Sequence, residues 1–393
     1  MLRQRSGLPG TSSILFAGLL AFSLSTHAGS GPGGGTGSGA GGGSDDTSDT
    51  TDNTDTDWTL LLGSDTTDYG NAIAIDGSGN LVVVGDTFGE VNGGVLQGSQ
   101  DMFIAMYAPV GTLLWSDQLG SADFDRYHGV ATDRDGNIFA IGSTSGSLGA
   151  ANLGGNDIVL SKYDNAGNLL WVNQLGTAGS DQGYAVGADS LGNLYLCGET
   201  TGSLGAVNTT YNSDAFVAKL DADGNTLWID QFSSSFQLGE GENCRDLAVD
   251  GNDSVYVTGY TPGVLVEGAS GAEFYVRKYA ASGGVEWTIQ RDSVYLNEAN
   301  SIAVDPDGNI YVAGTGGLDT VVSGLEDAFV VKFDAAGNEQ WFALLQSTGQ
   351  ESLNGIAVDA SGSDYFLVGS TDGALDGQLN NGAYDLFTTR NRP

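Results

Sequence analysis

The sequence has few of the residues that catalytic and metal sites use most often. It holds two histidines, two cysteines and 13 lysine or arginine residues among 393. His27 falls in the N-terminal leader described below, which leaves His128 alone in the rest of the chain. A Ser-His-Asp triad or a histidine-rich metal site therefore has little material to work with. We expect His128 to lie on the surface or at a sheet edge.

Positive charge is scarce. The 49 acidic residues against 13 basic ones give a net charge of −36. Such a polyanionic surface repels nucleic acid and anionic membranes, so we exclude both as partners. It favours cations, basic partners or solubility in salt.

Long apolar runs are also rare. The run Ile14 to Leu24 is short for a membrane span, follows Arg3 and Arg5, and is followed by the small residue Ala28. This layout predicts a secretory signal peptide over residues 1–28. No cysteine follows it to carry a lipid anchor, and no second apolar segment predicts a membrane span. We therefore expect a secreted protein, located outside the cell, in the periplasm or at the cell surface.

Residues 29–57 contain almost no large apolar side chains. They are Gly-, Ser-, Asp- and Thr-rich, and such a composition buries too little apolar surface to offset the entropy of ordering. We interpret them as a disordered linker. Aromatic and aliphatic residues return at Trp58, and nothing in 58–393 has helical periodicity.

What the region 58–393 does contain is a sixfold repeat. The six tryptophans of the chain recur at near-constant spacing: Trp58, Trp115, Trp171, Trp228, Trp287 and Trp341. A second marker, an apolar run that closes on an acid, keeps step with them: Asp76, Asp133, Asp189, Asp250, Asp305 and Asp359. Repeats of this length with several strands each are typical of propeller blades.

Each unit predicts four strands, which we call a to d. In the first unit these are about 70–76, 80–86, 101–108 and 113–119. Gly- and Asn-containing turns separate a from b and c from d, where these residues supply positive φ. Strands such as Leu81 to Val84 are apolar on both faces, as expected when sheets pack on both sides. The fold class is therefore all-β, a six-bladed propeller with four antiparallel strands per blade.

The two ends of the repeat region complement each other. The sixth unit supplies strands near 353–359, 364–369 and 385–390 but no fourth strand or tryptophan, while Trp58 begins the region as an orphan strand d. We expect the Trp58 strand to complete the last blade and close the ring, which leaves no open sheet edge.

Residues 307–315 (Asp-Gly-Asn-Ile-Tyr-Val-Ala-Gly-Thr) and 327–338 carry a family resemblance. They, and the matching segments 135–144, 157–171 and 214–228, resemble the bacterial β-propeller repeat (SBBP) family. The resemblance implies a propeller in a secreted or surface protein and no particular reaction, since fold does not decide function.

Two series of acids are the candidate functional residues. One precedes strand a, at Asp68, Asp125, Asp181, Glu242 and Glu351, with Glu298 one place off. The other precedes strand c: Asp101, Asp157, Asp214, Glu273, Asp327 and Asp385. Both belong to the loop face formed by the d–a and b–c connections. Oxygen donors without histidine or thiolate suit a hard cation such as Ca²⁺. The alternative is that each acid holds a local turn.

The four lysines occupy one slot of strand c, with Arg390 in the last unit and Met106 in the first: Lys162, Lys219, Lys278 and Lys332. We expect each cation to pair with a fixed carboxylate, either the acid that ends strand a or one in a neighbouring blade, because an unpaired buried charge is costly.

Cys197 and Cys244 allow one disulfide, which would join adjacent blades. The alternative is two buried thiols, which we favour because the two slots could lie too far apart for bonding.

These observations predict a secreted, monomeric, non-catalytic binding or scaffolding propeller. It would recognise an extracellular protein, a glycan or a cation through the d–a and b–c loops. One alternative is a carbohydrate-active lyase or hydrolase with axial carboxylates assisted by Arg126 and Tyr127. Another is a purely structural surface protein.

Overall fold

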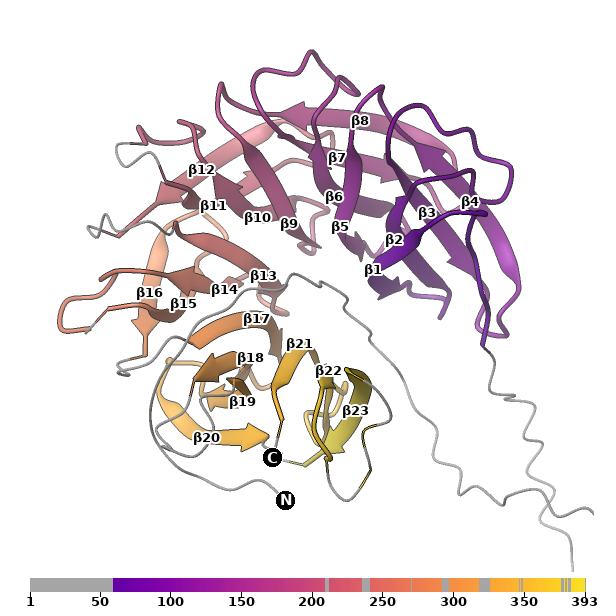
Figure 1. Ribbon diagram of the computed structural model, residues 1–393. Coiled ribbons are helices and arrows are strands. Elements are labelled where there is room, and N and C mark those ends of the chain that lie inside the picture. Colours follow the sequence, from indigo (N-terminus) through magenta and orange to yellow (C-terminus); the bar gives the residue numbers. More distant parts are fainter. Residues whose placement is uncertain are drawn as a thin grey trace, which may run out of the picture.

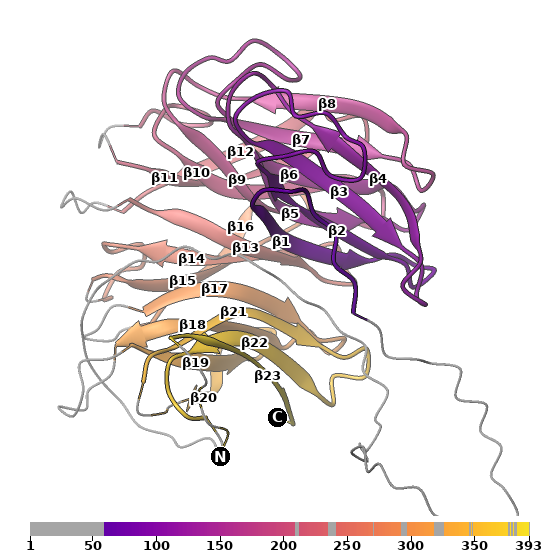
Figure 2. The same cartoon turned by 45° about the vertical axis from the view of Figure 1, so that its right-hand side comes forward.

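The computed structural model describes residues 59–208, 212–234, 241–269, 271–291, 297–317, 326–345, 347, 349–375, 378, 380 and 383–392. The predicted signal peptide (1–28), the predicted linker (29–57) and Trp58 lie outside the described residues. The described part is all-β and forms six antiparallel sheets around a common axis (Figures 1 and 2).

The sheets follow one another along the chain. The first has strands β1 (Asp68–Ile75), β2 (Leu81–Thr87), β3 (Asp101–Tyr107) and β4 (Leu113–Leu119). The second has β5 (Asp125–Thr132), β6 (Ile138–Thr144), β7 (Asp157–Tyr163) and β8 (Leu169–Leu175). The third has β9 (Asp181–Ala188), β10 (Leu194–Thr200), β11 (Asp214–Leu220) and β12 (Thr226–Phe232).

The fourth sheet has β13 (Asn243–Val249), β14 (Val255–Thr261), β15 (Glu273–Tyr279) and β16 (Val285–Gln290). The fifth has β17 (Asn297–Val304), β18 (Ile310–Gly317), β19 (Glu326–Phe333) and β20 (Glu339–Leu345). The sixth has β21 (Glu351–Val358), β22 (Tyr365–Thr371) and β23 (Asp385–Asn391). The predicted strands therefore agree with the structure to within one or two residues.

The tight turns between strands a and b are built by the acid that ends strand a. In the first blade the Asp76 N–H donates to the Asn80 carbonyl at 3.0 Å, and Asp76 Oδ1 accepts the N–H groups of Ser78 and Asn80 at 2.8 Å each. The same arrangement recurs at Asp305. These repeated acids therefore act as turn formers.

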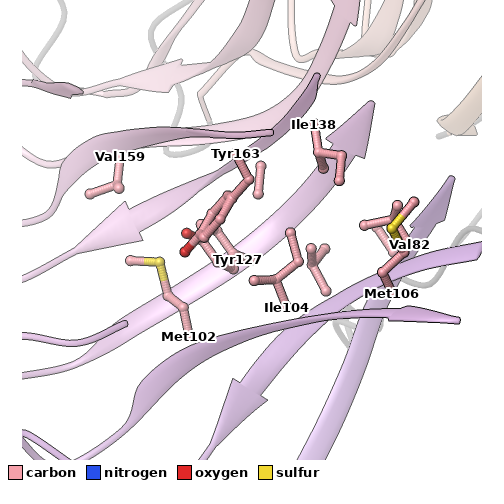
Figure 3. Close-up of a cluster of buried hydrophobic side chains, with 11 residues drawn as sticks. Val82, Met102, Ile104, Met106, Tyr127, Ile138, Val159 and Tyr163 are labelled. Atoms are coloured by element: carbon pink, nitrogen blue, oxygen red, sulfur yellow. The ribbon is translucent and has the colours of Figure 1, made fainter. Parts of the chain in front are cut away.

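The first strand of each blade is the innermost one. Successive inner strands contact each other along the series β1, β5, β9, β13, β17 and β21 (Figure 1). The apolar core lies between sheets and not within one. Figure 3 shows such a core, in which Met102 and Ile104 of blade 1 pack against Tyr127 and Ile138 of blade 2. Burial between neighbouring sheets explains the continuous apolar runs in the sequence.

The tryptophans of strand d also join blades. The turn between strands c and d contains a glycine with positive φ, for example Gly167 at 85°. A Cβ atom on Gly167 would lie 2.6 Å from the Trp115 ring of the preceding blade, and one on Gly283 would lie 2.8 Å from the Trp228 ring. Glycine is therefore required there for two reasons: the backbone has a positive φ, and a Cβ atom would clash with the neighbouring indole ring.

The last sheet has three strands in the described residues, with β23 at one edge. Residues 59–63 belong to no strand, and Trp58 is not described. Closure of the ring by the N-terminal strand therefore stays a prediction.

Candidate functional site

The acids that precede strand a are engaged within their own loops. Asp125 Oδ2 accepts the N–H of Ser121 at 2.5 Å and its hydroxyl at 2.8 Å, and Oδ1 accepts the Thr144 hydroxyl. Asp125 is fully buried, and this burial raises its pKa, whereas the hydroxyl and N–H donors oppose the shift. The carboxylate therefore closes the d–a loop and ties it to the end of strand b.

Four other predicted site residues have the same pattern. Each accepts an N–H from the preceding loop and a threonine hydroxyl from strand b: Asp68, Asp181, Glu242 and Glu351. In blade 5 the strand register places Asn297 in this slot, opposite Gly316, and Glu298 one place further along. That slot is therefore held by an amide.

The acids at the start of strand c face the same loop region. Asp101 Oδ2 accepts the Gln97 N–H at 2.9 Å and the Gln118 side-chain amide at 3.0 Å. Asp157 Oδ2 accepts equivalent bonds from Leu153 and Gln174. These acids therefore fix the b–c loop against strand d. Across the described ranges, no group of three or more His, Cys, Asp or Glu side chains is placed to hold a metal ion.

The lysine slot has a partner that the sequence analysis missed. Strand register places each strand-c cation opposite an aromatic residue of strand b, and the cation lies over that ring, from Lys162 over Phe139 at 5.2 Å to Lys332 over Tyr311 at 4.7 Å. In blade 1, where Met106 replaces lysine, the opposite residue is Val82. Cation–π pairing across the strands therefore explains the slot.

The expected ion pairs differ between blades. Lys219 Nζ lies 2.9 Å from Asp189, the acid that ends strand a, which confirms the prediction in blade 3. Lys278 pairs instead with Glu286 of strand d at 2.9 Å. Arg390 pairs with Asp364, the residue before strand b.

Cys197 and Cys244 form a disulfide with a Cα–Cα distance of 5.6 Å. Our preference for two free thiols is therefore wrong. The two slots are close because strand b of one blade packs against strand a of the next, which residue spacing alone did not reveal.

The inner strands contain a feature that no residue count predicted. Each has a β-bulge of one residue at the same position, and all six bulged residues are polar and partly exposed: Asn71, His128, Tyr184, Arg245, Asn300 and Asn354. Bulges are frequent beside functional sites, where they redirect a side chain. We call these six residues the axial ring.

Half of the axial ring is asparagine, and two of the three asparagines bond one blade to the next. Asn71 Nδ2 donates to the Tyr127 carbonyl of the next inner strand at 2.7 Å, and Asn300 Nδ2 donates to the Leu353 carbonyl at 2.9 Å. Asparagine therefore has a structural reason to recur at this slot.

The other half, on consecutive blades 2 to 4, departs from asparagine. The His128 ring meets the Tyr184 ring edge to face at 5.4 Å, and the Arg245 guanidinium lies 4.9 Å from the Tyr184 ring centre. The Tyr184 hydroxyl donates to Glu199 at 2.8 Å. We call His128, Tyr184 and Arg245 the axial arc. In the described part of the chain, Arg245 makes no ion pair.

The axial arc is electrostatically unusual. Desolvation lowers the pKa of His128 to about 3, and Arg126 and Arg245 act in the same direction. Burial likewise raises the pKa of Asp86, which pairs with Arg126 at 3.5 Å. A neutral imidazole beside two guanidinium groups can donate or accept a hydrogen bond without adding charge.

Tyr127, named with Arg126 in the catalytic alternative, is fully buried, and its hydroxyl is 2.6 Å from that of Ser161. Tyr184 is therefore the axial tyrosine. The signal in the sequence was the slot that holds asparagine in three units and His, Tyr or Arg in the others.

Six antiparallel sheets with contacting inner strands define this protein as a six-bladed β-propeller. The sequence profile of the beta-propeller repeat family SBBP matches residues 57–90, 114–149, 170–205 and 295–317. The chain therefore contains SBBP beta-propeller repeats in these four regions, as the resemblance predicted.

Two curated proteins are similar in sequence. "Regulatory protein FlaEY" of Caulobacter vibrioides is 26% identical over 345 residues, which cover 77% of this chain and 36% of that protein. "Uncharacterized WD repeat-containing protein L264" of Acanthamoeba polyphaga mimivirus is 23% identical, with coverage of 77% and 29%. The chain thus spans about a third of the length of these relatives.

Among solved structures, the α-L-arabinofuranosidase Arb93A of Fusarium graminearum superposes with a TM-score of 0.51 at 9% identity, covering 84% of this chain and 96% of that one. A Dyadobacter fermentans protein of unknown function gives 0.46 at 10% identity, with the same coverage. At this identity the likeness shows the fold alone. Among the residues that the structure describes, none forms a helix long and apolar enough to cross a membrane.

Proposed function

We propose that this protein is an exported, non-catalytic binding propeller whose axial arc recognises a glycan that carries carboxylate groups. The observation that carries the proposal is the break in the repeat at the bulge slot. Three blades keep the asparagine, two of these bonded to the next inner strand, and three consecutive blades carry His128, Tyr184 and Arg245. Symmetry lost at one slot in adjacent blades suggests selection for a ligand.

The chain as a whole repels polyanions, but Arg126 and Arg245 make the surroundings of His128 locally positive. The chemistry of the arc therefore suits a short acidic sugar and not an extended polyanion. Arg245 offers a guanidinium that lies over the Tyr184 ring and forms no ion pair within the described residues, and arginine recognises carboxylates well. Tyr184 combines an aromatic face with a hydroxyl, and His128 adds a neutral hydrogen-bonding group. Export rests on the predicted signal peptide and is supported by the Cys197–Cys244 disulfide, which is typical of oxidising compartments.

The test restores the residue that the repeat itself prefers. The variants His128→Asn, Tyr184→Asn and Arg245→Asn would be compared with wild type for binding to oligogalacturonides and to neutral oligosaccharides by calorimetry. We expect wild type to prefer the acidic ligand and Arg245→Asn to weaken its binding about tenfold, as expected for one lost charge-assisted pair.

Arg134→Asn is the matched control, because Arg134 is exposed in an a–b turn at the other end of the strands. Equal binding by wild type and the three arc variants would contradict the proposal, as would failure of wild type to bind any acidic glycan. Cleavage of the bound oligosaccharide would overturn its non-catalytic part and favour the lyase or hydrolase alternative.

We propose, in addition, that Trp58 completes the sixth blade. Each described junction from blade 1 to blade 5 places a strand-d tryptophan against the c–d turn glycine of the next blade: Trp115 at Gly167, Trp171 at Gly224, Trp228 at Gly283 and Trp287 at Gly337. Gly111 of blade 1 has the same positive φ of 83°. The tryptophan that this pattern assigns to Gly111 is Trp58.

A further inference from the structure

The two acid series meet in pairs at the junctions between blades. The Asp125 N–H donates to the carbonyl of Gln100, the residue before Asp101, at 2.9 Å. Asp181 and Glu242 donate in the same way to Asn156 and Ser213, which precede Asp157 and Asp214, at 2.7 and 2.9 Å. These bonds bring together the residue pairs Asp101–Asp125, Asp157–Asp181 and Asp214–Glu242, and in the first pair the charge of Asp101 acts on Asp125. We call them the junction pairs.

The junction pairs are buried. Each of the six residues has 3% or less of its surface exposed. Two carboxylates removed from water at one site repel each other, and each loses its hydration. The Asp101 charge accordingly contributes to the raised pKa of Asp125.

One oxygen in each pair has no partner. Asp101 Oδ1, Asp157 Oδ1 and Asp214 Oδ1 are buried without a hydrogen bond, although Oδ2 of each side chain is bonded. Buried carboxylate oxygens are normally satisfied, and three bare ones at equivalent positions indicate a missing partner that is common to the three junctions. The missing partner must be a donor or a positive charge.

The junction between blades 4 and 5 supplies an internal comparison. Asn297 replaces the strand-a acid there, and its Nδ2 lies 2.9 Å from both Oε1 and Oε2 of Glu273. An amide donor in the second slot therefore satisfies the acid in the first slot directly. Where both slots hold acids, neither ionised carboxylate can donate a hydrogen bond. Another group must then supply the donor or the positive charge.

We propose that a hard divalent cation, for which Ca²⁺ is the probe, binds at each of the three junction pairs and bridges the two carboxylates. The donors are all oxygen, which is the preference of Ca²⁺. With two carboxylates per site, the remaining ligands are backbone carbonyls or water. We therefore expect dissociation constants in the range of extracellular calcium modules, about 10⁻⁴ to 10⁻³ M.

The cations cross-link blades 1 to 4. Each joins the start of strand c in one blade to the start of strand a in the next, so that bound Ca²⁺ stabilises the folded propeller through linkage. The sites are separate from the axial arc, and their failure would leave the glycan proposal intact.

The experiment measures Ca²⁺ binding by calorimetry and thermal melting in EDTA and in millimolar CaCl₂. We expect at least three sites in wild type, because Asp327 and Glu351 stand in the two slots at the next junction, and a melting temperature that rises with Ca²⁺. Asp125→Asn places an amide in the slot that Asn297 holds in blade 5, so it should lose one site, and its melting temperature should respond less to Ca²⁺ than that of wild type. Asn297→Asp should add one site opposite Glu273 and make the junction of blades 4 and 5 depend on Ca²⁺.

Glu273→Gln is the matched control, because the proposal assigns no cation to its junction, and it should leave the three sites unchanged. The proposal is wrong if CaCl₂ and EDTA give the same melting temperature and calorimetry detects no binding at millimolar concentration. It is also wrong if Asp101→Asn stabilises the protein equally in both media, because the pair would then hold a proton or a water molecule.

Discussion

At the scale of single residues, the repeat uses pairs of side chains and not isolated ones. Aromatic residues of strand b and cations of strand c occur together, as in Tyr311 with Lys332, and both are replaced in blade 1 by Val82 and Met106. The joint replacement indicates that each member is kept for the other. Such pairs contribute about 0.5–1 kcal/mol each when partly exposed.

His128 gives a prediction on pH dependence. Its pKa in the folded state is lowered to about 3 from the ordinary value of 6.5. Between these two pH values, histidine is therefore protonated in the unfolded chain and neutral in the folded one. The stability that this group contributes is present above pH 6.5 and is lost as the pH falls towards 3. The variant His128→Asn lacks this group. When the pH falls from 7 to 5, we expect its free energy of unfolding to rise by about 1 kcal/mol relative to that of wild type, because partial exposure screens the effect.

Urea unfolding of both proteins at several pH values checks this. Parallel pH profiles for wild type and His128→Asn would contradict the burial that the structure gives to this ring.

At the scale of elements, inner strands carry both the rigidity and the variation of the molecule. Their bulges place the axial ring, and their first residues anchor the d–a loops. Cys244 lies next to the bulged Arg245 and is bonded to Cys197 of the preceding blade. The disulfide therefore holds the strand that carries one end of the axial arc.

The disulfide gives the second prediction. The double variant Cys197→Val, Cys244→Ala uses residues that stand in these slots in other units, at Val84 and Ala299, so it should pack well. A bridge with a sequence separation of 47 contributes about 4 kcal/mol by the chain-entropy argument. We expect a lower melting temperature for the variant under oxidising conditions.

Reductant should lower the melting temperature of wild type and leave that of the double variant unchanged. Equal melting of the two oxidised proteins would show that the bridge contributes nothing to stability.

At the scale of the whole molecule, the remaining question is how the ring ends. The last sheet has β23 at its edge in the described residues, and an exposed edge strand is a site for unwanted pairing. The proposed Trp58 strand would cover that edge and place a tryptophan against the turn at Gly111.

Closure gives the third prediction. Trp58→Ala should lower the free energy of unfolding by about 3 kcal/mol, the usual cost of truncating a packed aromatic residue. Thermal and urea unfolding measure it. Leu191→Ala is the matched control, because Leu191 is exposed in an a–b turn and its truncation should cost little. Equal losses of stability in the two variants, or a loss in neither, would argue against the closing strand.

The sequence by itself determined the strands, the turns and the number of blades. These depend on local chemistry: β-branched runs, acids that end strand a and glycines with positive φ recur in every unit and act within a few residues of their position. Periodicity therefore revealed them, and the strand bounds agree closely with the structure.

Only the tertiary structure decided which residues meet between blades. The disulfide, the axial arc and the junction pairs join residues of neighbouring blades, some 24 to 61 positions apart, whose distance depends on how one sheet packs on the next. Position in the repeat places His128, Tyr184 and Arg245 in one slot, at a constant spacing before the acid that ends strand a, but it did not show that this slot is a bulge or that the three side chains meet. Which side chains meet across a blade junction depends on how one sheet packs on the next. The sequence of a single repeat does not determine this packing.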